Sequence, residues 1–183
     1  CSSAASDVYK RQQLWRRNDN KVKALFISAI ITAAGRSQRF GSQKQFKPLG
    51  GKPLYQHSLR VFMTSKIIKE IILVVPMDNL HAVLKYIDES NQSIVKVVAG
   101  GATRRHSVQS GVEASSNDTD LIVIHDAARP FVTREMLGSV ITACEESDGA
   151  IAAIPAIDTV KYSKNGIVEK TLDRNYVWLA QTP

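Results

Sequence analysis

The chain of 183 residues lacks several features that would assign it to a specialised class of protein. It has only two cysteines, Cys1 and Cys144, which form neither a disulfide framework nor a CxxC zinc pattern. Such sparse cysteine usage suits a reducing compartment. None of its apolar runs approaches the ~20 residues needed to span a bilayer. The sequence therefore indicates neither a disulfide-stapled secreted domain nor a helical membrane protein.

Familiar nucleotide- and metal-binding signatures are also missing. Neither GxGxxG nor GxxxxGK[ST] occurs, which disfavours a dinucleotide-dependent dehydrogenase and a Walker-type NTPase. Aromatic residues are not interleaved with the basic ones, as a single-stranded nucleic-acid binder would need. No His, Cys and Glu cluster occurs at metal-ligand spacing, so a bound metal would be Mg²⁺ carried largely by substrate phosphates.

Positive charge is concentrated at the start of the chain. Of the net charge of +7, residues 1–23 carry +4, with six Lys or Arg side chains against two Asp, and leave +3 for the rest. This segment has no apolar h-region, so it is not a secretory signal. We expect residues 1–23 to be a non-native or disordered leader; a transit-peptide tail is the less favoured alternative. We expect one domain over residues 24–183, incomplete at its C-terminus.

Beyond the leader, apolar segments alternate with helical patterns. Strands are expected at residues 24–31, 70–76, 93–101, 120–126 and 149–156. Helices are expected at residues 50–65, 78–90, 104–116 and 134–148, with Asp78 and Thr133 as N-caps of the second and fourth. This alternation predicts βαβ units, a parallel sheet and right-handed crossovers. The predicted fold class is α/β: a Rossmann-like, three-layer domain with a mostly parallel sheet.

The pattern changes after residue 156. The stretch DTVKYSKNGIVEKTL reads as two short strands around a KNG turn. A hairpin attached to a parallel sheet has little to bury against its own domain. We therefore expect residues 157–172 to form a protruding β-arm that contacts another molecule.

Three loops are expected at the carboxyl edge of the sheet, where ligands of such folds bind. In the first, the small residues Ala33, Ala34 and Gly35 precede the cations Arg36, Arg39, Lys44 and Lys47. Small residues let backbone N–H groups approach phosphate oxygens, while Arg and Lys neutralise the charge. The pattern favours a phosphate cradle over a plain solvated loop.

The other two loops cover residues 100–105 and 125–131. Gly100 and Gly101 form either a tight turn or a close approach for a flat ligand. Asp126 and Arg129 either pair with each other in a structural turn or face a metal–phosphate complex and an anion. His125 fits a structural residue better than a base, because it is a single His at a strand end.

Five segments, in this order, resemble the 2-C-methyl-D-erythritol 4-phosphate cytidylyltransferase family: AAGRSQRFG with KQF, GGATRRHSV, HDAARPFV, Asp158–Thr159, and TLDRNYVWLAQTP. AAG alone is shared by many nucleotidyltransferases, whereas the later segments are specific in combination. This chain has Arg36 and Ser37 where many members carry a glycine. The family also continues beyond QTP with helical sequence that supplies further substrate contacts.

The resemblance implies a nucleotidyltransferase domain whose β-arm forms a homodimer, and a divalent cation, Mg²⁺, on the substrate phosphates near Asp126. It implies that CTP phosphates are held by Ala33, Ala34, Gly35, Arg39 and Lys44, of which Arg39 and Lys44 are the catalytic cations. The cytidine would meet Gly100, Gly101, Ser107 and Ala127. The sugar phosphate would meet Asp126, Arg129 and Thr159, and in the partner subunit's site Arg174 and Thr182.

The implied reaction joins CTP to methylerythritol phosphate and releases pyrophosphate. The nucleophile is a phosphate oxygen with a second pKa of about 6, so no catalytic base is needed. Alternatives are a cytidylyltransferase for another polyol phosphate, such as ribitol 5-phosphate, and an inactive nucleotide-binding fragment. We expect a bacterial cytoplasmic protein, a plastid being less favoured, with no nucleic-acid or membrane partner.

Overall fold

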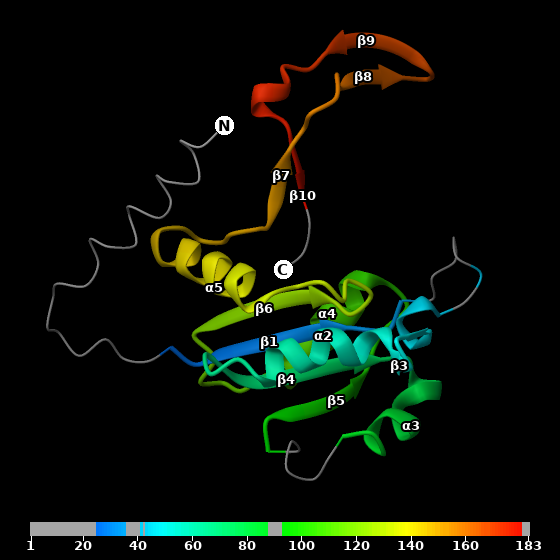
Figure 1. Cartoon of the computed structure of the whole chain (residues 1–183), viewed down its shortest axis with the longest axis vertical. Helices are drawn as coiled ribbons and strands as arrows, with labels where there is room; N and C mark the ends of the chain where they lie inside the picture. Colours follow the sequence, from blue (N-terminus) through cyan, green and yellow to red (C-terminus); the bar gives the residue numbers. More distant parts are fainter. Residues whose placement is uncertain (1–24, 36–40, 42, 88–92, 181–183) are drawn as a thin grey trace, which may run out of the picture.

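The computed structural model describes residues 25–35, 41, 43–87 and 93–180 (Figure 1). The predicted leader and two predicted site residues, Arg39 and Thr182, lie outside these ranges. None of the helices within the described ranges is long and apolar enough to cross a membrane.

Four parallel strands form the central sheet, in the order β5-β4-β1-β6. They are β1 (Ile27–Thr32), β4 (Ile68–Val75), β5 (Val95–Ala99) and β6 (Leu121–Asp126). In β4 every residue but Lys69 is buried, as expected for a strand covered on both faces. The predicted α/β fold class and four of the five predicted strands are therefore confirmed.

Helices cover both faces of this sheet (Figure 1). The helices are α2 (Leu54–Met63), α3 (Leu80–Leu84), α4 (Arg104–Ala114) and α5 (Arg134–Ala143). Side chains of α2, α3 and α5 share one apolar core with alternate residues of the strands. The other face holds a smaller core around Ile30 and Ile72, against which Ala114 of α4 packs.

Helix starts show which capping predictions hold. The Thr133 hydroxyl accepts a hydrogen bond from Met136 N–H at 3.1 Å, which confirms the predicted cap of α5. The helix predicted at residues 78–90 is shorter than expected. A 3-10 turn, η4 (Met77–Asn79), precedes α3, so Asp78 is not its N-cap.

The fifth predicted strand does not join the parallel sheet. Only Ala153–Pro155 is extended, as β7, and it pairs antiparallel with β10 (Trp178–Ala180). The physical reason is burial: a strand of a parallel sheet is covered on both faces, whereas Ile151 and Ile154 of this segment are exposed. Pro155 also lacks the N–H that a central strand would donate.

The predicted β-arm is present. Its strands are β8 (Lys161–Lys164) and β9 (Ile167–Thr171), and both are exposed along their whole length. Asn165 and Gly166 have φ of 51° and 79°, the left-handed pair that a two-residue hairpin turn requires. Figure 1 shows the arm projecting away from the layered domain.

Short elements complete the described chain. A two-stranded ribbon, β2 (Pro48–Leu49) with β3 (Lys52–Pro53), joins the 3-10 helix η3 (Lys44–Phe46) to α2. Two further 3-10 helices are η6 (Cys144–Glu146), after α5, and η7 (Arg174–Tyr176), at the base of the arm.

Candidate active site

The loops after β1, β5 and β6 meet at the carboxyl edge of the sheet, as predicted. Strand register places Thr32, the last residue of β1, opposite Asp126, the last residue of β6. A Cβ atom built on Gly100 would lie 2.2 Å from Ala34 Cβ and 2.8 Å from Ser107 Oγ. No larger residue fits at position 100 without displacing the first loop or α4.

Hydrogen bonds hold the small-residue loop against the end of the sheet. Ala33 N–H donates to Val74 O at 2.7 Å, which extends the pairing of β1 with β4. The buried Gln45 amide donates to Ala33 O at 2.6 Å and to Gly35 O at 2.8 Å. The loop therefore has a defined path up to Gly35, which is exposed.

Gln45 positions the small-residue loop, a contact that was not predicted from the sequence. The other two residues of η3 have different surroundings. Phe46 packs on Tyr55 of α2 with ring centroids 5.4 Å apart, and Lys44 is exposed. Since Gln45 and Phe46 face inward, Lys44 is held near the small-residue loop. The sequence KQF contains all three residues, but only the lysine stands out in the sequence, because of its charge.

The second loop positions the first turn of α4. A Cβ on Gly101 would lie 2.4 Å from His106 Cβ, so this glycine is required by close packing. The Thr103 hydroxyl accepts from His106 N–H at 3.2 Å and caps α4. The buried Ser107 hydroxyl donates to Thr103 O at 3.1 Å.

Asp126 is the centre of a polar cluster. Its Oδ1 accepts from Thr32 Oγ1 at 3.1 Å and from Arg104 Nε at 3.0 Å, with Arg104 Nη2 at 2.9 Å. Arg129 Nε lies 3.6 Å from Oδ2. The Asp126–Arg129 pair of the structural alternative is thus present, but Arg104, which the sequence reasoning missed, makes the closer contacts.

His125 is a structural residue. It is 1% exposed and packs on the Phe62 ring, with centroids 5.2 Å apart. Its Nε2 donates to Arg129 O at 3.1 Å, because a carbonyl can only accept. Burial lowers the pKa of His125 to about 4. A buried, neutral imidazole that already donates its N–H to a backbone carbonyl does not act as a general base.

The remaining predicted site residues are either buried beneath the carboxyl edge of the sheet or lie away from that edge. Ala127 is fully buried, with its N–H bonded to Thr32 O and its carbonyl to Ser58 Oγ. Thr159 lies in the arm and Arg174 in η7 at its base, and Figure 1 shows this part of the chain projecting away from the sheet. Arg174 Nη1 donates to Ile157 O at 2.9 Å.

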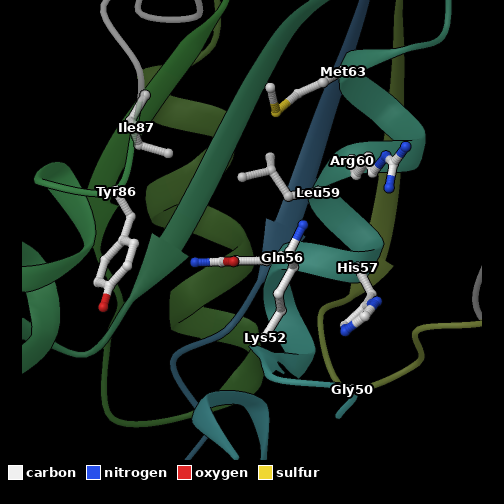
Figure 2. Close-up of a pocket in the computed structure, with 9 residues that line it drawn as sticks. All are labelled: Gly50, Lys52, Gln56, His57, Leu59, Arg60, Met63, Tyr86 and Ile87. Carbon is white, nitrogen blue, oxygen red and sulfur yellow. The ribbon is translucent and has the colours of Figure 1, made fainter. Parts of the chain in front are cut away.

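A cavity of about 380 Å³ lies elsewhere, between α2 and the segment that follows α3 (Figure 2). Tyr86 and Ile87, which follow α3, form its opposite wall, and Lys52 and Arg60 stand at its rim. No predicted site residue lines it.

Among the described residues, no three His, Cys, Asp or Glu side chains gather to hold a metal ion, so a cation at the sheet edge would need ligands from substrate.

Comparison with known proteins agrees with this arrangement. The sequence matches the family 2-C-methyl-D-erythritol 4-phosphate cytidylyltransferase over residues 27–183. The enzyme of that name from Geobacter metallireducens is 40% identical over 164 residues, covering 86% of this chain and 71% of the relative. The one from Aquifex aeolicus is 43% identical over 156 residues, covering 85% and 68%.

Solved structures agree as well. The crystal structure of 4-diphosphocytidyl-2C-methyl-D-erythritol synthase from Anaerococcus prevotii superposes with a TM-score of 0.78 at 33% identity, covering 88% of this chain and 70% of that one. The Francisella tularensis cytidylyltransferase has a TM-score of 0.66 at 30% identity, covering 86% and 70%. The chain therefore belongs to the 2-C-methyl-D-erythritol 4-phosphate cytidylyltransferase family.

Proposed function

We propose that this protein transfers the cytidylyl group of CTP to 2-C-methyl-D-erythritol 4-phosphate, giving 4-diphosphocytidyl-2-C-methyl-D-erythritol and pyrophosphate. Family membership supports the reaction. The observation that carries the site assignment is the meeting of three loops at one sheet edge: a small-residue loop beside Lys44, a close-packed Gly-Gly turn, and the Asp126 cluster.

The chemistry needs no proton transfer. A phosphate oxygen of the sugar phosphate, already ionised at neutral pH because its second pKa is about 6, attacks the α-phosphorus of CTP. The bond from that phosphorus to the bridging oxygen breaks, and pyrophosphate leaves with the electron pair. The barrier lies in bringing two anions together and stabilising charge on the equatorial and leaving oxygens.

The first loop is proposed to bind the phosphates of CTP. A Cβ on Gly35 would meet nothing within 4 Å, so the described residues leave open space beside Gly35. Lys44 is proposed to stabilise the leaving pyrophosphate as a point charge, and Arg39 to act with it. The cytidine is proposed to lie against the Gly100–Gly101 turn, with the buried Ser107 and Ala127 behind it.

Asp126 and Arg129 are proposed to bind the sugar phosphate. Mg²⁺ in proteins uses one or two carboxylates together with substrate phosphate oxygens, and the part-exposed Asp126 carboxylate fits such a role. When bound, the ion would neutralise phosphate charge. Thr159 and Arg174 lie on the arm, so we propose that they and Thr182 complete the site of a second subunit.

A homodimer is therefore part of the proposal. The arm strands contact each other, while Ile157, Ile167 and Tyr176 are 81%, 72% and 84% exposed. Large apolar side chains exposed on one projecting element favour a contact with another molecule. A two-fold interface would cover both arms and exchange Arg174 reciprocally.

Two single variants test the division of roles. Lys44→Ala is expected to lower kcat about 10²–10³-fold with little change in KM for CTP, as when one preorganised stabilising group is lost. Arg129→Ala is expected to raise KM for the sugar phosphate more than KM for CTP. Steady-state pyrophosphate release measures both.

Lys66→Ala is the matched control, because Lys66 is exposed and precedes β4 at the opposite edge of the sheet. It should leave kcat within about twofold of wild type, as surface changes usually do. A kcat near wild type for Lys44→Ala would remove Lys44 from the mechanism. Equal losses for both substrates in Arg129→Ala would make Arg129 a purely structural partner of Asp126.

A further inference from the structure

Arg104 makes an unusual contact for an exposed residue at the start of a helix. It is the first residue of α4, yet its side chain reaches the end of β6, where Nε and Nη2 both converge on Asp126 Oδ1. Hydrogen bonds from a guanidinium to a carboxylate are shorter and stronger than neutral ones. The contact therefore holds Asp126 Oδ1 in place.

The two oxygens of Asp126 have different surroundings. Oδ1 accepts from Arg104 Nε, from Arg104 Nη2 and from the Thr32 hydroxyl, at 2.9–3.1 Å. Among the described residues, Oδ2 is contacted by Arg129 Nε at 3.6 Å, which is longer than the contacts of Oδ1. One oxygen is thus committed to the protein, and the other retains most of its capacity to accept.

Three separate elements produce this asymmetry. The register of β1 with β6 places Thr32 beside Asp126. The Thr103 cap sets the direction in which α4 begins, and so the position of Arg104. The Gly-Gly turn allows that helix start to approach the sheet edge, because side chains at Gly100 and Gly101 would collide with Ala34 and His106.

Charge supports a role in substrate binding over a role in stability alone. Arg104, Arg129 and Asp126 together carry a net charge of +1 at a part-exposed site. An exposed ion pair stabilises a fold by only about 0–1 kcal/mol. A pair with two donors on one oxygen is better explained by the need to orient that carboxylate.

We propose that Arg104 is a positioning residue for the transfer reaction: with Thr32 it occupies Oδ1 of Asp126 and thereby presents Oδ2 to the sugar-phosphate substrate. This inference rests on the proposed role of Asp126. Arg104 acts through the carboxylate, so its contribution disappears when the carboxylate is absent.

A double-mutant cycle tests this directly. Arg104→Met, Asp126→Asn and the double variant are compared by kcat/KM for the sugar phosphate at saturating CTP. Arg104→Met is expected to lower kcat/KM about 10–100-fold, as when the outer partner of a ligating carboxylate is lost. Asp126→Asn is expected to lower it at least as much. The double variant should fall within about threefold of Asp126→Asn, because the two losses are coupled.

Two further variants guard against trivial explanations. Arg134→Met is the matched control, because Arg134 is also the exposed first residue of a Thr-capped helix, α5. It should stay within about twofold of wild type. Arg104→Lys keeps the charge but loses the planar fork, so it should recover only part of the loss in Arg104→Met. Thermal unfolding confirms that each variant is folded, and Arg104→Lys carries the test if Arg104→Met is not.

The other outcomes separate this inference from the proposed function. Multiplying losses in the double variant would mean that Arg104 contacts substrate itself, which overturns the inference. Wild-type activity in Arg104→Met, with Asp126→Asn impaired, would also overturn it and leave the proposed function intact. Wild-type activity in Asp126→Asn would refute the role of Asp126 and the inference together.

Discussion

At the scale of single residues, burial decides what His125 can do. The imidazole lies under the sheet edge against Phe62, and its Nδ1 has no hydrogen-bond partner among the described residues. Protonation would place a charge in this apolar surrounding. The protein therefore holds His125 neutral, whereas its neighbour Asp126, one residue further along β6, is paired with Arg104.

This burial predicts a pH dependence of stability. The folded pKa of His125, about 4, lies below the ordinary value of 6.5, so the unfolded chain takes up a proton first as pH falls. The stabilisation is complete above about pH 6.5 and is lost as pH falls toward 4. Between about pH 7.5 and 5, the free energy of unfolding should drop by about 2 kcal/mol more in wild type than in His125→Gln.

Urea unfolding of both proteins at the two pH values measures this difference. His125→Gln keeps an N–H that can reach Arg129 O but does not titrate, so carboxylate contributions common to both proteins cancel. An equal pH response in wild type and variant would show that His125 is not buried as a neutral group.

The positions of candidate site residues were predictable where charge or size stands out in the sequence. Lys44, Asp126 and the Gly-Gly pair could be identified in this way, and the structure brings them to one edge. Gln45 and Arg104 could not, because their partners are distant in sequence: Arg104 meets Asp126, 22 residues away, and Gln45 meets Ala33, 12 residues away. Their roles follow from tertiary contacts that carry no local signal.

At the scale of elements, α4 and α5 differ in what surrounds their glycines. Each contains one mid-helix glycine. A Cβ on Gly111 of α4 would lie 2.5 Å from Ile30 Cγ2, whereas one on Gly138 of α5 would meet nothing within 4 Å. The glycine in α4 is therefore a packing requirement, while the one in α5 is only a weak point in a helix.

Two Gly→Ala variants test this contrast. Gly111→Ala should lower the free energy of unfolding by about 1–3 kcal/mol, because the methyl group overpacks the α4–β1 interface. Gly138→Ala should raise it by about 0.5–1 kcal/mol, because alanine is the better helix former and the space is open. Chemical denaturation measures both, and the same sign for the two variants would contradict the packing described for α4.

Most elements could be predicted because their signals are local. Four apolar runs became the parallel sheet, and the KNG turn became the Asn165–Gly166 hairpin. The segment of residues 149–156 was misassigned, because an apolar run does not reveal whether both of its faces will be covered. Exposure of Ile151 and Ile154 leaves only a short strand, β7, paired with β10.

At the scale of the whole molecule, the arm is the part that the layered domain does not explain. Its apolar side chains are exposed, and it carries Thr159 and Arg174 away from their own sheet edge (Figure 1). A site completed by the arm of a second subunit accounts for both observations. In such a dimer, Lys44 and Arg174 of one site come from different chains.

Subunit mixing tests this arrangement. Lys44→Ala and Arg174→Ala should each be nearly inactive alone. After joint refolding in equal amounts, half of the dimers would be mixed, and each would contain one site with both side chains intact. Activity should recover to roughly a quarter of wild type in a two-fold dimer. No recovery, with mixed dimers shown to form, would place Arg174 in its own chain's site or outside the mechanism.

We propose that this sheet edge joins CTP to methylerythritol phosphate. The most direct measurement is pyrophosphate release by the protein with Mg²⁺, using each of the four ribonucleoside triphosphates with 2-C-methyl-D-erythritol 4-phosphate or ribitol 5-phosphate. We expect fast release from CTP with methylerythritol phosphate, about tenfold or more above every other pair, as for a site built to hydrogen-bond one substrate pair. Faster release with ribitol 5-phosphate, or with another nucleotide, would contradict it.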